Sequence, residues 1–209
     1  MIQSRKSLIS HLSNHGISNA KVLEALGRIP RHQFVEESLQ ARAYHDVALP
    51  IGHAQTISQP WVVARMAELL FLHSQSAYPD LIFEVGTGSG YQTALLAQLT
   101  KRVVTIERIF ALHSQAQHLL TSLGVENIEC RYASSHLASD HAQYDAVILS
   151  AASDEIPVDL FSVLKPQGVM IIPLGNTKQQ LTVLKKNKNG VETYTYEQVV
   201  FVPYLKGEI

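Results

Sequence analysis

The sequence predicts an α/β fold: a mostly parallel sheet with helices on both faces, an antiparallel C-terminal strand pair, and an N-terminal helical extension. Three observations lead to this fold class. From residue 79 onward, short apolar runs alternate with helical periodicity, which is typical of a parallel sheet covered on both faces. Near the C-terminus, Asn189-Gly190 separates two strand-like segments and is a strong hairpin signal. Before residue 79, apolar residues recur at helical spacing.

The composition limits the class of protein. Hydrophobic residues make up 46% of the 209 residues and charged residues 17%, which supplies a sizeable core and excludes a disordered chain. The formal net charge is −1, whereas nucleic acid and anionic membranes attract basic surfaces. We therefore expect no nucleic-acid and no membrane partner. The sequence has no run of about 18 apolar residues, so we also expect no membrane span.

The single cysteine, Cys130, indicates the redox compartment. It cannot form a disulfide within the chain, and no Cys/His spacing typical of a metal site is present. We expect no metal site and a reducing compartment. The residues after Arg5-Lys6 are too polar for the core of a signal peptide. A cytoplasmic protein is the resulting expectation, and we expect a monomer.

The N-terminal elements are expected to be helices around one long loop. Apolar residues have helical spacing from Val22 to Ile29, and Pro30 ends this helix. A further short helical piece begins at Phe34. Residues 48–60 contain two prolines, a glycine and small polar residues, the composition of a loop. A second helix is expected over residues 61–72, because Pro60 suits the first turn of a helix.

The remaining elements are expected to alternate between strands and helices. Strand-like apolar runs occupy residues 81–85, 103–106, 146–149 and 169–172, and a further strand is expected at residues 128–132. Helical spacing appears between the first three runs, and Gly124 is expected to end the second of these helices. The hairpin strands are expected at residues 181–184 and 192–202. We predict a single domain, 1–209, in which residues 79–209 form the sheet and its hairpin and residues 1–78 form the helical extension and the loop.

A glycine cluster marks the predicted ligand site. Gly86, Gly88 and Gly90 follow the first strand and open a helix, which is where open α/β sheets bind ligands. The spacing is G-x-G-x-G, and Tyr91 stands where a dinucleotide fingerprint would have its third glycine. S-adenosylmethionine (SAM) needs no pyrophosphate pocket, whereas NAD does. The pattern favours a Rossmann-like fold that binds SAM.

Two acidic residues stand at strand ends beside the glycines. Glu84 precedes the turn and could bind the amino group of the cofactor, or it could be a strand-end acid that faces solvent. Glu107 ends the second strand, where an acid typically accepts hydrogen bonds from ribose hydroxyls. Its alternative role is that of an acid at a helix N-terminus, stabilised by the helix dipole.

Several segments together resemble one enzyme family. The string from Leu49 to Pro60, with Val63-Ala-Arg-Met66 after it, is similar to the signature of the protein-L-isoaspartate O-methyltransferase family. Further matching segments run in order along nearly the whole chain: residues 30–36, 83–92, 144–148, 151–152, 173–175 and 201–203. The stretch from Gln55 to Pro60 is specific to this family among methyltransferases.

The resemblance implies a function. Members methylate the free α-carboxylate of L-isoaspartyl residues in damaged proteins or peptides, and the ester then collapses to a succinimide, which initiates repair. SAM is the implied cofactor. Ser58 is the implied active-site residue, and its alternative role is that of N-cap of the helix after it. The surrounding loop residues are implied to bind substrate: Ile51, Gly52, Gln55 and Thr56.

The sequence departs from the family after the third strand. Ala133-Ser134-Ser135 stands where the family has Gly-Asp-Gly beside the adenine. Ser134 can still donate or accept a hydrogen bond there, but it has no carboxylate. This departure predicts SAM binding weakened by about tenfold. Two alternatives follow: a paralogue with weakened or lost activity that acts as a binding protein, or a methyltransferase for another carboxylate acceptor.

Overall fold

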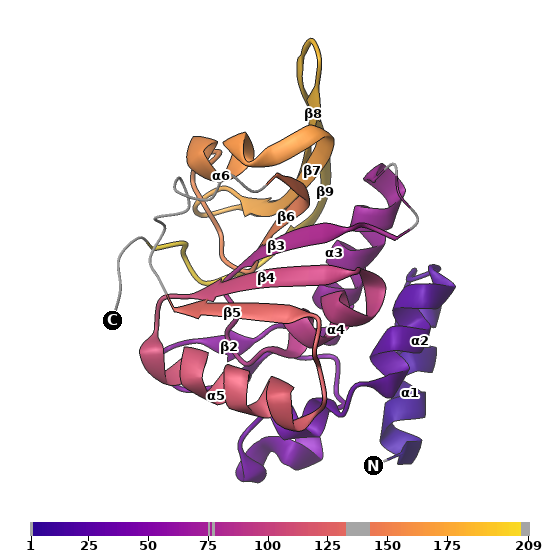
Figure 1. The fold of residues 1–209 in the computed structure, drawn as a ribbon. Coiled ribbons are helices and arrows are strands. Elements are labelled where there is room, and N and C mark those ends of the chain that lie inside the picture. The colour runs from indigo at the N-terminus through magenta and orange to yellow at the C-terminus, as the bar shows by residue number, and fades with distance from the viewer. Residues whose placement is uncertain (1, 75, 77, 133–142, 206–209) are drawn as a thin grey trace.

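The computed structural model describes residues 2–74, 76, 78–132 and 143–205. A seven-stranded sheet forms its centre, in the order β5-β4-β3-β6-β7-β8-β9 (Figure 1). The strands are β3 (Leu81–Val85), β4 (Arg102–Glu107), β5 (Ile128–Tyr132), β6 (Tyr144–Leu149), β7 (Leu164–Leu174), β8 (Gln179–Asn187) and β9 (Gly190–Val199). The first five strands in the spatial order are parallel, and β8 is antiparallel to both β7 and β9. The predicted fold class is confirmed.

Helices cover both faces of this sheet. On one face lie α3 (Pro60–His73), α4 (Tyr91–Leu99) and α5 (Phe110–Ser122), and on the other lies α6 (Val158–Ser162). Alternation along the strands supplies an apolar surface to each face. Ile82 and Ile148 are buried with residues of α3, whereas Phe83 and Val147 are buried with Leu160 of α6.

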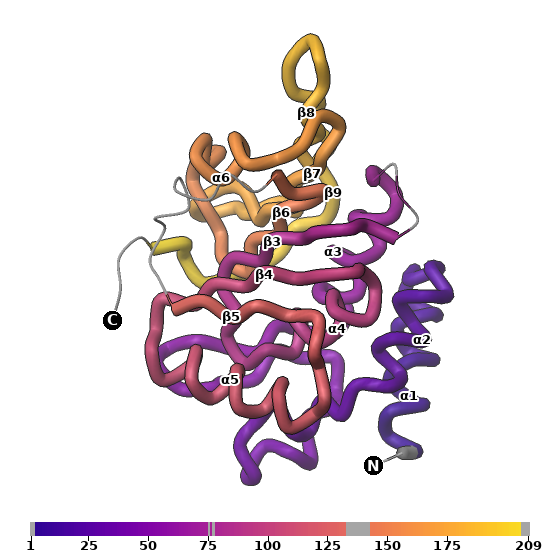
Figure 2. Tube along the Cα trace, in the orientation of Figure 1, coloured from indigo at the N-terminus to yellow at the C-terminus, as the bar shows by residue number. Residues whose placement is uncertain are grey.

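The N-terminal extension packs beside α4. It consists of α1 (Ile2–Asn14), α2 (Ala20–Arg28) and two short 3₁₀ helices, η1 (Arg31–Phe34) and η2 (Glu37–Arg42). Val22 and Leu26 of α2 are buried in one cluster with Leu95 and Leu99 of α4. The Cα trace in Figure 2 shows α1 and α2 side by side at the flank of the molecule. The prediction of short helices in this part is confirmed.

The C-terminal hairpin agrees with the predicted strand pair and differs in its turn. Asn187 pairs with Gly190, so the two turn residues are Lys188 and Asn189. Gly190 opens β9 with φ at +134°, a conformation that glycine adopts without strain. Inside the predicted loop, two short strands, β1 (Leu49–Pro50) and β2 (Thr56–Ile57), form an antiparallel pair. No sequence pattern had indicated α6, because five residues are too few to display helical periodicity.

Within the described ranges, which leave out residues 1, 75, 77, 133–142 and 206–209, no helix has the length and apolar character needed to cross a membrane.

Candidate active site

A cavity opens at the carboxyl ends of the parallel strands. Its volume, including the open mouth, is about 990 Å³, and open α/β sheets bind ligands at this edge. Most of its wall comes from four chain segments: residues 55–58 of the loop before α3, residues 85–89 after β3, residues 106–109 after β4, and residues 202–205 near the C-terminus. The other lining residues are Val63, Tyr91, Gln92, Ser150 and Ala151. The loop of residues 48–60, here called the acceptor loop, and the glycine turn after β3 thus line the same cavity.

The glycine turn lines this cavity with two of its three glycines. Gly86 and Gly88 are lining residues. Gly86 has φ at +93°, and its N–H donates to the carbonyl oxygen of Ile106 over 2.9 Å. Gly90 is not a lining residue. A Cβ there would lie 3.0 Å from Cδ1 of Leu120, so this glycine allows α4 to pack closely against α5.

Glu107 joins the ends of the two strands beside the cavity. Its side chain is 5% exposed and lines the cavity. One carboxylate oxygen accepts the N–H of Gly88 over 2.9 Å, and the other accepts the N–H of Ile109 over 3.0 Å. A carboxylate oxygen accepts more than one hydrogen bond. Glu107 therefore holds the glycine turn and the start of α5 and still has acceptor capacity toward the cavity.

Glu84 does not reach the cavity that the glycines line. Its carboxylate is fully buried and accepts hydrogen bonds from the hydroxyls of Thr93, at 2.5 Å, and Thr105, at 2.8 Å. Burial raises the pKa of Glu84 to about 7, against the opposing effect of these hydrogen bonds. Glu84 is not among the lining residues, and its carboxylate binds Thr93 of α4, so the structure does not support the expected contact with the amino group of the cofactor. The solvent-facing alternative is wrong, because the residue is fully buried.

The acceptor loop divides into lining and supporting residues. Gln55, Thr56 and Ser58 line the cavity, whereas Ile51 and Gly52 do not. Gly52 is in the turn between β1 and β2, where its carbonyl oxygen accepts the N–H of Gln55 over 2.8 Å. Cδ1 of Ile51 is 3.6 Å from the point where a Cβ on Gly88 would lie. Ile51 therefore packs the acceptor loop against the glycine turn.

The N-terminus of α3 is capped by a remote aspartate. Gln59 occupies the N-cap position without a side-chain cap bond. Oδ1 of Asp46 accepts the N–H of Trp61 over 2.8 Å, and Oδ2 accepts the side-chain amide of Gln59 over 3.0 Å. The alternative interpretation of Ser58 as the N-cap is therefore wrong. Ser58 is instead one of the residues that line the cavity.

Arg31 holds the backbone of the acceptor loop. The sequence analysis assigned it no role in the site. Its side chain is fully buried. Nη2 donates to the carbonyl oxygen of Ser58 over 2.8 Å, and Nε donates to the carbonyl oxygen of Ala43 over 2.9 Å. The guanidinium carbon lies 4.5 Å from the centre of the Tyr91 ring. The sequence offered one indication of this role: Arg31 directly follows Pro30, at the end of a helix with an apolar face.

A second cavity adjoins the first. It has a volume of about 1140 Å³, including its open mouth, and shares Thr56, Ser58, Ser150 and Val202 with the first cavity. Trp61 and residues 198–201 complete its wall. The sequence analysis did not predict that the C-terminal segment would line both cavities. Ala152 holds this segment, since its N–H donates to the Val202 carbonyl oxygen over 2.8 Å.

One predicted cofactor residue, Ser134, lies outside the described residues, as do Ala133 and Ser135. Across the part of the chain that the structure covers, no three His, Cys, Asp or Glu side chains come together in a group that could hold a metal ion.

Comparisons with known proteins agree on one family. The family model described as protein-L-isoaspartate(D-aspartate) O-methyltransferase matches residues 3–209. A Pseudomonas paraeruginosa protein named protein-L-isoaspartate O-methyltransferase is 46% identical, over 99% of this chain and 98% of the relative. A Cellvibrio japonicus protein of the same name is 43% identical, over 99% of this chain and 93% of the relative.

Solved structures support the fold. A protein-L-isoaspartate O-methyltransferase structure from Plasmodium falciparum, in complex with S-adenosyl-L-homocysteine, superposes with a TM-score of 0.82 at 24% identity. It covers 95% of this chain and 97% of the Plasmodium chain. A second structure of the same name has a TM-score of 0.81 at 23% identity, over 96% of this chain and 65% of the other. The chain belongs to the protein-L-isoaspartate(D-aspartate) O-methyltransferase family.

Proposed function

We propose that this protein transfers the methyl group of SAM to the free α-carboxylate of L-isoaspartyl residues in damaged proteins or peptides, and so initiates repair through a succinimide. One observation carries the proposal. Ser58 and Thr56 of the acceptor loop face Gly86, Gly88 and Glu107 across a single cavity. A cofactor held by the glycine turn would therefore present its reactive end to the loop that is specific to this family.

The residues at the cavity fit SAM. Glu107 has acceptor capacity for ribose hydroxyls beyond its bonds to the N–H groups of Gly88 and Ile109. The turn at Gly86, with no side chain and φ at +93°, lets the backbone approach a ligand closely. We assign cofactor contacts to Gly86, Gly88, Glu107 and Ser134. Gly90 and Glu84 act instead as supports of the turn, through packing and buried hydrogen bonds.

The chemistry asks little of the protein beyond positioning. When bound, SAM supplies an electrophilic methyl group on its sulfonium sulfur. A carboxylate with an ordinary pKa near ~4 is already ionised at neutral pH, so the acceptor needs no general base. The protein has to orient the carboxylate oxygen toward the methyl carbon and exclude water. These requirements fit a site with a serine and backbone groups rather than an acid–base pair.

Ser58 is the proposed positioning group for the acceptor carboxylate. Its residue lines both cavities, and the carbonyl oxygen of Ser58 is fixed by Arg31. A hydroxyl donates one hydrogen bond, which suits a carboxylate oxygen. Gln55 and Thr56 are the neighbouring substrate contacts. Ile51 and Gly52 contribute by holding the loop in shape.

The second cavity is the proposed place for the acceptor chain. It lies between the start of α3 and the end of β9 and shares Ser58 with the first cavity. An isoaspartyl residue has its side chain in the main-chain path, so its free α-carboxylate projects as a branch. With the peptide in the second cavity, this branch would extend past Ser58 into the first.

The remaining sequence-based expectations stay proposals. The lone Cys130 supports a reducing compartment such as the cytoplasm. The near-zero net charge supports a protein that does not act on nucleic acid. We further propose that the chain acts as a monomer and folds as the single domain 1–209, in which the N-terminal helices share a buried cluster with α4.

The test of the proposed function is a methyl-transfer assay with paired peptides. A peptide with one L-isoaspartyl residue should become a methyl ester in the presence of SAM, and the same peptide with normal aspartate should not. Equal methylation of both peptides would favour another carboxylate acceptor. Tight SAM binding without transfer to either would favour a binding protein.

A further inference from the structure

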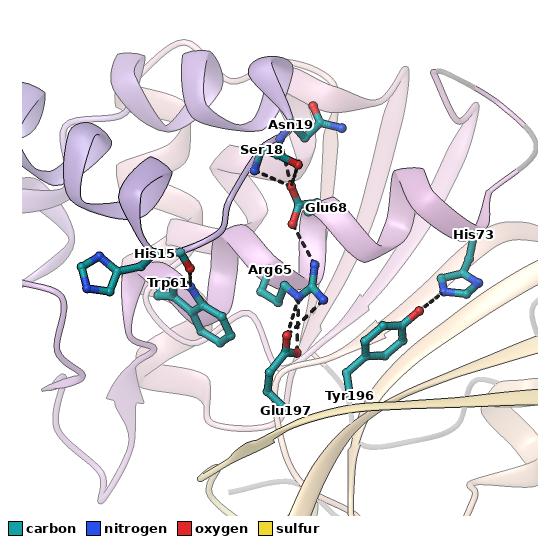
Figure 3. Close-up of polar contacts among 9 residues, drawn as sticks. All are labelled: His15, Ser18, Asn19, Trp61, Arg65, Glu68, His73, Tyr196 and Glu197. Carbon is teal, nitrogen blue, oxygen red and sulfur yellow. Dashed lines mark hydrogen bonds and ion pairs between the residues drawn. The ribbon is translucent and has the colours of Figure 1, made fainter.

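The helix α3 is joined to both ends of the chain by one charged network, which Figure 3 shows. Arg65 donates through Nη1 to Oε2 of Glu68 over 2.8 Å. On its other side, Arg65 forms an ion pair with Glu197 of β9, with Nη2 and Oε1 3.0 Å apart. Nε of Arg65 is also 3.1 Å from Oε1 of Glu197. One guanidinium thus binds two carboxylates that lie far apart in the sequence.

The Glu68 arm of the network reaches the N-terminal extension. Oε1 of Glu68 accepts the backbone N–H groups of Ser18, over 2.7 Å, and Asn19, over 2.9 Å. Asn19 is the N-cap of α2. Although burial tends to raise it, the pKa of Glu68 is held below its ordinary value by these N–H groups and by Arg65. This arm therefore anchors α2 to α3.

The Glu197 arm depends on a bulge in β9. The register shifts between the pairs Gln180–Gln198 and Thr182–Thr195, so Tyr196 and Glu197 together stand opposite a single residue of β8. In a regular strand, successive side chains point to opposite faces. Here both turn toward α3: the hydroxyl of Tyr196 lies 2.5 Å from Nε2 of His73, and Glu197 binds Arg65 (Figure 3). Bulges re-aim side chains in this way next to functional sites.

The ion pair between Arg65 and Glu197 is called the clamp below. Its position relative to the second cavity suggests its purpose. The next residues along the chain after Glu197, residues 198–202, line the second cavity, and Trp61 and Val62 line it from the α3 side. Arg65 and Glu197 therefore join two of the elements that contribute to the wall of that cavity. Trp61 is fixed independently, since its indole N–H donates to the carbonyl oxygen of His15 over 2.9 Å. The Arg65–Glu197 pair instead ties the wall from β9 to α3, beside the contact of Tyr196 with His73.

The exposure of Glu197 argues against a role in stability. Its side chain is 39% exposed and that of Arg65 is 18% exposed, and solvent-accessible ion pairs contribute little to stability. The Glu68 side chain is 9% exposed and accepts two backbone N–H groups at the start of α2, so its arm carries the structural role. The two carboxylates on one arginine therefore differ in function.

We propose that Arg65 and Glu197 are a positioning pair for the methyl acceptor: the clamp at the β9 bulge sets the width of the second cavity and so determines how well the acceptor peptide is held. The inference rests on the proposed function, because it takes the second cavity as the acceptor site. Neither residue lines either cavity, so the pair acts through residues 198–202.

Steady-state kinetics with an isoaspartyl peptide test the pair. Glu197→Gln keeps the size of the side chain and removes its charge. We expect the KM for the peptide to rise by about fivefold, with kcat and the Kd for SAM within about twofold of the unaltered protein. Glu197→Asp, which retains the charge, should recover part of the loss. The matched control is Glu68→Gln, on the other arm of the same arginine, which should lower Tm and leave the peptide KM unchanged.

The outcomes are distinguishable. An unaltered protein that methylates the peptide, together with an unchanged peptide KM in Glu197→Gln, overturns the clamp and leaves the proposed function in place. An equal rise of KM in Glu68→Gln and Glu197→Gln also overturns it, because a general loosening of α3 would then explain both. An unaltered protein that binds SAM and methylates no isoaspartyl peptide overturns the proposed function and the clamp together.

Discussion

Nη2 of Arg31 donates a hydrogen bond of 2.8 Å to the carbonyl oxygen of Ser58. A fully buried cation from the N-terminal extension thus fixes the backbone of the residue that faces both cavities. Nε of Arg31 donates to the carbonyl oxygen of Ala43 at 2.9 Å, and Nη2 also donates to that of Val47 at 3.3 Å. The position of the acceptor loop therefore depends on a residue that lines neither cavity.

The first prediction concerns Arg31→Met. The change removes the donor from one buried carbonyl oxygen and two partly buried ones, and an unsatisfied buried group costs about 1–3 kcal/mol. We expect the free energy of unfolding to fall by about 3 kcal/mol and kcat/KM to fall by more than about tenfold. Denaturant unfolding and initial rates measure the two effects. Arg31→Lys should rescue little, because an ammonium lacks the planar fork that reaches all three oxygens. Full activity in Arg31→Met would contradict this account.

Ser58→Ala separates positioning from capping. Since Asp46 accepts the N–H of Trp61 at the start of α3, loss of the serine hydroxyl should leave the free energy of unfolding within about 0.5 kcal/mol of its original value. The rate of methyl transfer should fall by about tenfold or more. Asp46→Ala is the matched control, and it should lower stability by about 1 kcal/mol as the lost cap. A Ser58→Ala protein that loses stability and keeps its rate would restore the capping interpretation.

Glu107→Gln should weaken SAM binding without unfolding the protein. The amide offers one acceptor oxygen where the carboxylate has two, and both carboxylate oxygens already accept an N–H, from Gly88 and from Ile109. The substitution therefore removes one of these hydrogen bonds and also the acceptor that a ribose hydroxyl would use. We expect the Kd for SAM to rise by about tenfold or more, measured by isothermal titration. An unchanged Kd would remove Glu107 from the cofactor site.

The pH dependence of stability should reflect Glu84. Burial raises the pKa of its carboxyl to about 7 in the folded protein, whereas the ordinary glutamate value is about 4.3. Between these values the folded state holds a proton that the unfolded state has released. The stabilisation from the protonated form is therefore complete below about pH 4.3 and is lost as the pH rises through 7.

Glu84→Gln removes this titration. In the unaltered protein, titration of Glu84 should lower the free energy of unfolding by on the order of 2 kcal/mol between about pH 5 and pH 7.5. The variant should lack this contribution. Chemical denaturation at a series of pH values measures the difference. Parallel pH profiles for the two proteins would show that Glu84 has an ordinary pKa in the folded state.

Much of the fold was predictable from the sequence. The apolar runs at residues 81–85 and 146–149 lie in β3 and β6, because buried parallel strands bounded by turn residues leave a mostly apolar pattern. The same holds for the placement of Gly86, Gly88 and Glu107 at one cavity, since the carboxyl ends of neighbouring parallel strands meet at one edge of the sheet.

The contacts that complete the site were not predictable in this way. Asp46 caps α3 and Arg31 binds Ser58 across separations of 15 and 27 residues, and no local spacing rule relates such pairs. Glu84 stands beside the glycines in the sequence, yet the alternation of β3 turns its carboxylate toward α4. The bulge at Tyr196 and Glu197 is likewise a property of strand pairing, which periodicity along one strand does not reveal.

The central claim is that the protein methylates an isoaspartyl carboxylate in the cavity that Ser58 and Glu107 line. The most direct test is the initial rate of methyl transfer from SAM to an L-isoaspartyl peptide, measured beside the same peptide with normal aspartate. We predict methyl-ester formation on the isoaspartyl peptide at a rate at least about a hundredfold above that of its twin, since only the isoaspartyl peptide presents a free α-carboxylate at that position. Equal rates on the two peptides, or no transfer to either while SAM is bound, would contradict the claim.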